Sequence, residues 1–142
     1  MSTATGAQPV GQYGEGVPRP PDGVAARLQT VTDRRDSAVI LQARGEVDAY
    51  TLPAWQRIVR ETAAHATTAG PVIVDITGLD FISCSALATL ASQAEVCREQ
   101  GSDLAMVCRA GVVHRVAAAT GLDQRLAIYT TTDAAVRASA PS

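Results

Sequence analysis

Residues 71–87 read PVIVDITGLDFISCSAL, and this stretch decides the fold. Its first apolar run, 72–74, predicts a strand that is buried on both faces. A turn follows, then the small polar residues of 83–85, and a helical pattern begins at once. The first N–H groups of a helix are unpaired and carry the positive end of its dipole, which favours a phosphate or a thiolate nearby. We therefore expect the functional residues at this strand–helix junction.

The composition bounds the class of protein. The 142 residues suit one domain, and 46% of them are hydrophobic, which is enough for a core. Aromatic residues make up only 4%, so we expect an aliphatic core. The formal net charge is −2 and no basic patch is evident, so nucleic-acid binding has no electrostatic support. No apolar run reaches the length of a transmembrane helix, so no membrane is expected as a partner.

The chain divides into a tail and one folded region. Residues 1–23 are rich in glycine and proline and poor in large apolar side chains, so we expect a disordered tail. The tail has neither the basic start nor the apolar run of a signal peptide, which makes a cytoplasmic location the default expectation. Residues 24–142 are expected to form the domain.

Turn and helix signals give an ordered set of elements in the folded region. Strands are expected at residues 27–32, 38–43, 72–76, 103–108 and 127–129. Helices are expected at residues 51–65, 85–100, 111–120 and 132–136. Two strands come first as a hairpin, and strands and helices then alternate. This order predicts an α/β fold: a mixed β-sheet with helices packed mainly on one face.

Several single positions carry their own expectations. Thr51 should cap the first of these helices, and Gly101 should terminate the second. Trp55 falls at helical spacing and should lie in the core, and Asp75 should end its strand. The helix at 85–100 should bury one stripe, made of Leu87, Leu90, Ala91, Ala94 and Cys97.

The residues offer no catalytic or cofactor site. No glycine-rich phosphate loop is present. His65 and His114 lie in different expected helices and should both be solvated at the surface. Cys84 would need a nearby histidine to act as a nucleophile, and nothing places one there. The three cysteines are too widely spaced for a zinc site or a disulfide framework. We expect a protein that is not an enzyme and holds no cofactor or metal.

Four motifs, read in order, resemble the STAS domain of bacterial anti-sigma factor antagonists. They are GEVD at 45–48, VDITGLDFI running into SCSAL at 74–87, GSDL at 101–104 and TGLD at 120–123. The resemblance covers about residues 25–138, and such an ordered set is more specific than any one short motif. It implies the STAS fold and a protein that binds an anti-sigma factor and so releases a sigma factor.

The resemblance assigns roles to the loop before the second helix. In this family the loop usually reads Asp, a small residue that is commonly the phosphorylated serine, Ser or Thr, Gly and Leu. The Asp position is Ser83 here, the phosphoserine position is Cys84, the next hydroxyl is Ser85 and the Gly position is Ala86. Three interpretations stay open: packing and helix capping alone, a phosphosite moved to Ser85, or a thiol switch at Cys84.

The implied partner-binding surface joins this loop to the segment after the second strand. It comprises Asp48, Tyr50, Ser83, Cys84, Ser85 and Ala86. Loop polarity and helix capping alone would also explain Asp48 and Tyr50. The resemblance implies a serine-kinase-like anti-sigma factor as the partner and a protein phosphatase as a second one. The alternative is a structural STAS module that scaffolds or regulates a signalling assembly without a phosphoswitch.

Two cysteines form a candidate redox pair. Cys84 stands at a helix start, and Cys108 closes the fourth strand. If the third and fourth strands are parallel neighbours, their carboxyl ends meet at one edge of the sheet, and these two thiols could approach each other. Cys97 lies thirteen positions along the helix from Cys84 and is out of reach. Any oxidative link is therefore expected between Cys84 and Cys108, although a reducing cytosol disfavours it.

Overall fold

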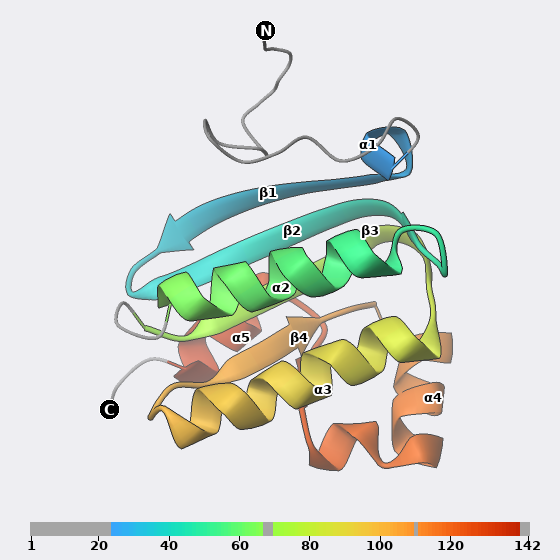
Figure 1. The fold of residues 1–142 in the computed structure, drawn as a ribbon. Helices are drawn as coiled ribbons and strands as arrows, with labels where there is room; N and C mark the ends of the chain where they lie inside the picture. Colours follow the sequence, from blue (N-terminus) through green and yellow to red (C-terminus); the bar gives the residue numbers. More distant parts are fainter. Residues whose placement is uncertain (1–23, 67–69, 110, 140–142) are drawn as a thin grey trace, which may run out of the picture.

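The computed structural model describes residues 24–66, 70–109 and 111–139. A five-stranded sheet in the order β1-β2-β3-β4-β5 runs through it (Figure 1). Its strands are β1 (Leu28–Arg35), β2 (Ala38–Val47), β3 (Val72–Ile82), β4 (Leu104–Val107) and β5 (Ala127–Tyr129). β1 is antiparallel to β2, and every other neighbouring pair is parallel. The predicted mixed sheet is confirmed. The expected disordered tail, 1–23, lies outside the described residues.

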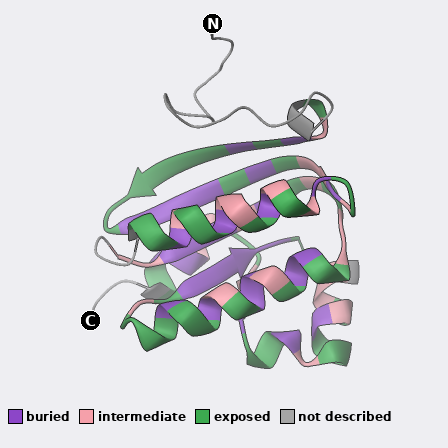
Figure 2. Ribbon diagram, in the orientation of Figure 1, coloured by how far each residue is buried: buried purple, intermediate pink, exposed green. Residues whose placement is uncertain are grey.

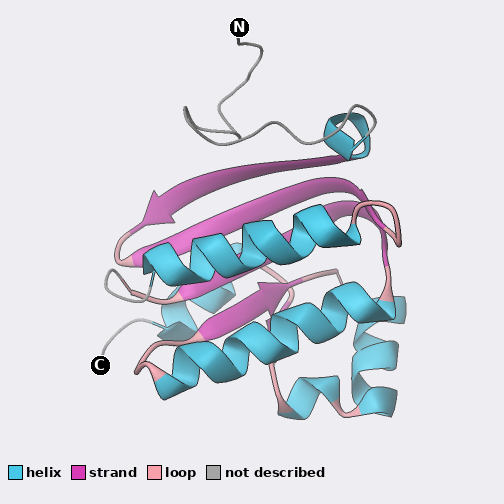
Figure 3. Ribbon diagram, viewed as in Figure 1, coloured by secondary structure: helices cyan, strands magenta, loops and turns pink. Residues whose placement is uncertain are grey.

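The helices lie mainly on one face of the sheet, as predicted. They are α1 (Val24–Arg27), α2 (Leu52–Ala66), α3 (Cys84–Glu99), α4 (Val112–Thr120) and α5 (Thr132–Ser139), with a short 3-10 helix, η2 (Leu122–Gln124), after α4. α2 and α3 lie side by side over one face (Figure 3). On the opposite face, Ala135 and Val136 of α5 pack against Ile40 and Ile73. No helix in the described ranges is long and apolar enough to span a bilayer.

The larger core lies between the sheet and α2, α3 and α4, and Figure 2 shows buried positions along these elements. Its residues are mainly aliphatic. Trp55 is fully buried within it, as expected. The stripe predicted on α3 is confirmed, because the buried residues of this helix are Ala86, Leu87, Leu90, Ala91, Ala94 and Cys97. Gly101 follows α3 with a φ of 81°, which fits its predicted role as the helix terminator.

β2 and β3 extend further than the sequence pattern predicts, and this is the main correction to the fold. β2 continues to Val47, and β3 runs on to Ile82, through the expected turn. Two register shifts between these strands break the alternation of buried and exposed residues that would have revealed the extension. Gly78 lies inside β3, where a Cβ would come within 2.8 Å of the Ala43 carbonyl oxygen. The glycine therefore serves close strand packing and not a turn.

Two expectations for single residues are wrong. Asp75 does not end β3, and its carboxylate accepts hydrogen bonds from the Thr77 N–H (2.9 Å) and the Thr132 hydroxyl (3.3 Å). His114 is not fully solvated, because its Nε2 is enclosed and has no hydrogen-bond partner within the described part of the chain. It lies on α4 three residues before Ala117, which packs in the core. Residues three apart share a helix face, so the ring falls at the edge of the buried side.

Candidate partner-binding surface

The ends of β2 and β3 lie side by side, and this brings together the two segments of the predicted surface. The Ser83 N–H donates a 2.9 Å hydrogen bond to the Val47 carbonyl oxygen. Val47 is also the register partner of Ile82. The loop that starts at Asp48 therefore begins beside the start of α3. We call residues 48–50 and 83–86 together the contact surface.

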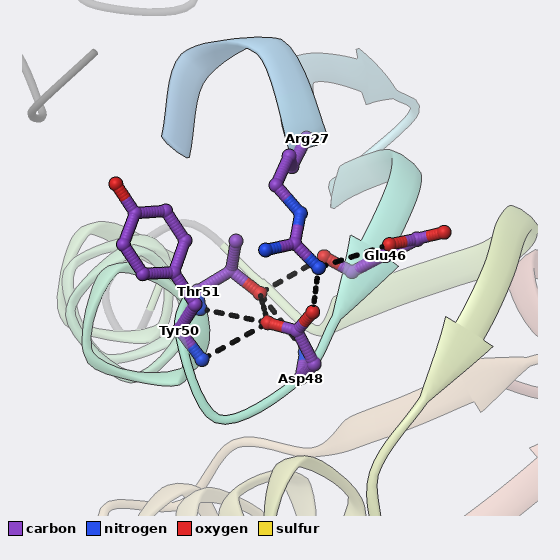
Figure 4. Close-up of polar contacts among 5 residues, drawn as sticks. All are labelled: Arg27, Glu46, Asp48, Tyr50 and Thr51. Atoms are coloured by element: carbon purple, nitrogen blue, oxygen red, sulfur yellow. Dashed lines mark hydrogen bonds and ion pairs between the residues drawn. The ribbon is translucent and has the colours of Figure 1, made fainter. Parts of the chain in front are cut away.

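Asp48 caps the turn that leads into α2 (Figure 4). Its Oδ1 accepts hydrogen bonds from the backbone N–H groups of Tyr50 (3.0 Å) and Thr51 (3.1 Å). The Thr51 hydroxyl in turn accepts the Asp48 N–H at 2.9 Å and donates to the Glu46 carbonyl oxygen. This reciprocal pattern is a capping box. We expected Thr51 to cap this helix, but the capping carboxylate belongs to Asp48. The buried Thr51 contributes the second hydrogen bond of the capping box.

Arg27, the last residue of α1, contacts this loop through its side chain (Figure 4). Its guanidinium pairs with the carboxylates of Glu46 and Asp48 and lies 5.4 Å from the centre of the Tyr50 ring. The approach depends on Gly45, which has a φ of 105° and at which a Cβ would come 2.0 Å from the Arg27 carbonyl oxygen. Sequence reasoning missed Arg27, because contacts that span 19 and 21 positions leave no local pattern.

The neighbours of Asp48 keep it charged. Partial burial of its carboxylate raises the pKa, but hydrogen bonds from Thr51 and Tyr50 and the positive charge of Arg27 favour the ionised form. The net effect lowers the pKa of Asp48 below its usual value. The contact surface therefore carries a fixed negative charge under a partly neutralising guanidinium.

Two aromatic side chains are exposed in this part of the chain, one in the charged loop and one near the end of β3. Tyr50 is 50% exposed and Phe81 is 52% exposed. Phe81 is the register partner of Glu46, so it belongs to the same pair of strands that carries the loop. Aromatic residues are enriched at protein interfaces because they combine a large contact area with few flexible bonds. Phe81 was not among the predicted site residues, since an apolar residue in a strand is ordinarily buried.

The start of α3 holds the other predicted residues in two different ways. Ser83 is the N-cap, and its hydroxyl oxygen accepts the Ala86 N–H at 3.1 Å. Ala86 is fully buried. The fold itself therefore uses these two residues, whereas Cys84 and Ser85 are exposed. Ser85 also lines a groove of about 490 Å³ between α2 and α3, to which Arg60 contributes.

The candidate redox pair lacks the geometry predicted for it. Cys84 is exposed, whereas Cys97 and Cys108 are buried, and all three are free thiols. β3 and β4 are parallel, as expected, but their last register pair is Asp75 with Val107. β3 continues well beyond that pair before the chain reaches Cys84, whereas Cys108 follows Val107 at once. Burial also raises the pKa of Cys108 to about 11, which disfavours its thiolate. The Cys84–Cys108 link was expected on the assumption that β3 ends near Asp75. The longer β3 carries Cys84 away from the end of β4, where Cys108 lies.

The contact surface combines charged, aromatic, hydroxyl and thiol groups. The described ranges contain no cluster of three or more side chains able to hold a metal ion. His65 is exposed at the far end of α2, where its Nδ1 lies 2.9 Å from the Glu61 carbonyl oxygen, and His114 lies in α4. The contact surface itself presents a charged loop, one exposed aromatic ring, a hydroxyl and a thiol. Such a set suits contact with another protein.

The STAS domain family model matches residues 29–135, so this chain belongs to the STAS domain family. The resemblance carried by the four motifs is thereby confirmed. Among curated relatives, the Mycobacterium tuberculosis protein Rv2638, provisionally named an anti-anti-sigma factor, is 44% identical over 109 residues, covering 77% of this chain and 74% of Rv2638. The anti-sigma-F factor antagonist RsfA of the same species is 40% identical over 116 residues, covering 82% of this chain and 91% of RsfA.

Solved structures agree on the fold. The crystal structure of an anti-sigma factor antagonist from Mycobacterium paratuberculosis matches with a TM-score of 0.71 at 24% identity, covering 79% of this chain and 93% of that chain. The anti-sigma factor antagonist SpoIIAA in its unphosphorylated form matches with a TM-score of 0.60 at 14% identity, covering 77% and 95% of the two chains. At such identities these likenesses show the shared architecture.

Proposed function

We propose that this protein is an anti-sigma factor antagonist, which binds an anti-sigma factor and so releases a sigma factor. The observation that carries the proposal is the hydrogen bond between Ser83 and Val47, because it joins both segments of the contact surface into one patch. The names of the relatives and the common fold support the same role. From this proposed action on a sigma factor we infer a cytoplasmic location.

Competition is the proposed mechanism. The contact surface presents the charged Asp48 and the exposed ring of Tyr50, and Phe81 is exposed in β3, in register with Glu46. Aromatic anchors within a polar rim commonly dominate the binding energy of an interface. An anti-sigma factor that engages this patch is no longer free to hold its sigma factor. The mechanism needs no enzymatic step in this chain.

The proposal extends to a serine-kinase-like partner that phosphorylates Ser85. Cys84, at the usual family position, has no hydroxyl, whereas Ser85 is exposed in the first turn of α3. The N–H groups of a helix start favour a phosphate, which would add about two negative charges. These charges would block docking by repulsion and by the cost of their desolvation. A protein phosphatase would restore binding.

A second candidate is a structural STAS module without a phosphoswitch. The observation that favours it is the use of the loop residues by the fold: the Ser83 hydroxyl caps α3 and the Ala86 methyl group is buried. These two of the three departures from the family pattern, Ser83 and Ala86, then need no regulatory explanation. Incubation with ATP and the anti-sigma kinase separates the two candidates.

The direct test is calorimetry with the full chain and purified anti-sigma factors of the serine-kinase-like class. Tyr50→Ala should weaken binding by about tenfold or more, because an aromatic anchor is lost. Arg137→Ala is the matched control, since Arg137 is exposed on α5, which packs on the opposite face of the sheet. Equal affinities for the two variants would refute the contact surface, and failure to bind any such factor would refute the function.

A further inference from the structure

Trp55 is the only tryptophan of the chain, and its side chain reaches the helix start that carries Ser85. The indole Nε1–H donates a 3.1 Å hydrogen bond to the carbonyl oxygen of Ala86. Both residues are fully buried, and Ala86 directly follows Ser85. A buried indole N–H needs an acceptor, but core packing alone does not require that this acceptor lie in the first turn of α3.

The backbone of Trp55 is bonded to Thr51, the residue that directly follows the other half of the contact surface. Its N–H donates to the Thr51 carbonyl oxygen at 3.0 Å, and the Thr51 side chain completes the Asp48 capping box. Trp55 is therefore bonded through its side chain to Ala86 in one half, and through its backbone to Thr51, which is itself bonded to Asp48 in the other half. The Ser83–Val47 bond is a separate tie between the strand ends.

Both ends of the Trp55 connection lie at capped helix starts. The capping box holds the start of α2, and the Ser83 hydroxyl holds the start of α3. A capped helix start resists fraying, because its first N–H groups are already paired. A displacement at one helix start is then passed along the indole bond instead of being lost in local disorder.

We propose that Trp55 is a positioning residue that couples the two halves of the contact surface. A negative charge added at Ser85 displaces Ala86, and the indole bond transmits the displacement to the Asp48–Thr51 loop. The inference rests on the proposed function, since it assigns to Trp55 the coordination of the phosphoswitch with the partner loop. The coupling itself is a property of the free protein, so it can be measured without a partner.

The test removes the indole N–H and little else. Because Trp55 is the single tryptophan, growth of a tryptophan auxotroph on β-(3-benzothienyl)alanine replaces this residue alone by a ring of similar shape without the donor. The readout is the amide chemical shift of Tyr50, whose N–H is bonded to Asp48. It is compared between the full chain and its Ser85→Asp variant. Ser92→Asp, exposed about two turns further along α3, is the matched control.

With the indole present, Ser85→Asp should shift the Tyr50 amide and Ser92→Asp should not. With benzothiophene, the response to Ser85→Asp should fall to the level of the control. The Ala86 and Leu87 amides, both held by Ser83, should also exchange about fivefold faster, as expected for one lost hydrogen bond.

A Tyr50 response that is unchanged without the donor, or that is absent in both proteins, would overturn the coupling. If the benzothienyl chain does not fold, Trp55→Phe serves as the second variant and should abolish the response in the same way. Failure to bind any anti-sigma factor would refute the proposed function but would leave this result standing, so the two failures are distinguishable.

Discussion

Ser83 holds Ala86 with its side chain while its backbone holds Val47. The hydroxyl oxygen accepts the Ala86 N–H at 3.1 Å, and the Ser83 N–H lies 2.9 Å from the Val47 carbonyl oxygen. One residue thus fixes both the first turn of α3 and its position beside the end of β2. The serine at this position is a structural residue, whatever happens at its neighbours.

Ser83→Ala should therefore destabilise the fold. Loss of the N-cap hydrogen bond should lower the free energy of unfolding by about 1 kcal/mol. Urea unfolding followed by circular dichroism measures the change. Ser85→Ala, two residues later and exposed, is the control and should stay within about 0.5 kcal/mol of the parent. Equal losses in both variants would contradict the assignment of Ser83 as the cap.

Gly45→Ala should be among the most damaging single substitutions. Its Cβ would lie 2.0 Å from the Arg27 carbonyl oxygen at a φ of 105°, so the strain and the clash together should cost about 3 kcal/mol. Gly101→Ala is the matched control, because Gly101 also has a positive φ but no atom within 4 Å of an added Cβ. That variant should lose only about 1 kcal/mol. Thermal unfolding of the two variants checks the difference.

Asp48→Asn should have a pH-dependent effect. The pKa of Asp48 in the folded protein is lowered, so its charged form contributes stability above the usual carboxyl range and loses it as pH falls through the lowered value. The gap in thermal midpoint between parent and variant should therefore be largest near pH 7 and shrink below about pH 4. In an Arg27→Gln background the gap should be smaller. A gap that is independent of pH would contradict the charge-based explanation.

Thiol reactivity should follow exposure. Cys84 is exposed, whereas burial raises the pKa of both Cys97 and Cys108, the latter to about 11. Iodoacetamide at pH 8 should therefore label Cys84 first, with the other two reacting only on unfolding. Peptide mapping over time measures the order, and the urea-unfolded chain is the control. Equal labelling of all three thiols in the folded protein would be contrary to this burial pattern.

Phosphorylation, if the kinase-like partner is present, should occur at Ser85. Intact mass after incubation with ATP should show one phosphate on the parent chain and none on Ser85→Ala. Ser92→Ala, exposed on the same helix, should keep the phosphate. Ser85→Glu should weaken the complex in calorimetry by introducing a charge at the interface. Full phosphorylation of Ser85→Ala would disprove the assignment.

The helices were predictable because their signal is local. The stripe from Leu87 to Cys97 has the spacing of one helix face, and this face is buried as predicted. The ends of β2 and β3 were not predictable, because two register shifts erase the alternation on which a strand is recognised. A glycine within β3 added a false turn signal.

The candidate site also has a part that the sequence predicts and a part that only the structure shows. Its position, the start of α3 together with the loop at Asp48, followed from motifs that are contiguous in sequence. Arg27 and the coupling of Trp55 to Ala86 join segments 21 and 31 positions apart, so only the folded chain shows them. The prediction of a solvated His114 was wrong for a similar reason. The residue pattern of a short helix does not show how the helix packs against the core.

The ion pairs of Arg27 with Glu46 and Asp48 have a consequence for how related chains should vary. Gly45 lets the backbone of Arg27 pack closely, and the carboxylates of Glu46 and Asp48 pair with the Arg27 guanidinium. Three of the four residues of the GEVD motif therefore contact this one arginine. Selection should act on the set as a unit. Related chains that keep both acidic residues should also keep the glycine and the arginine. Related chains that lose the acidic residues should show no such constraint on the other two positions.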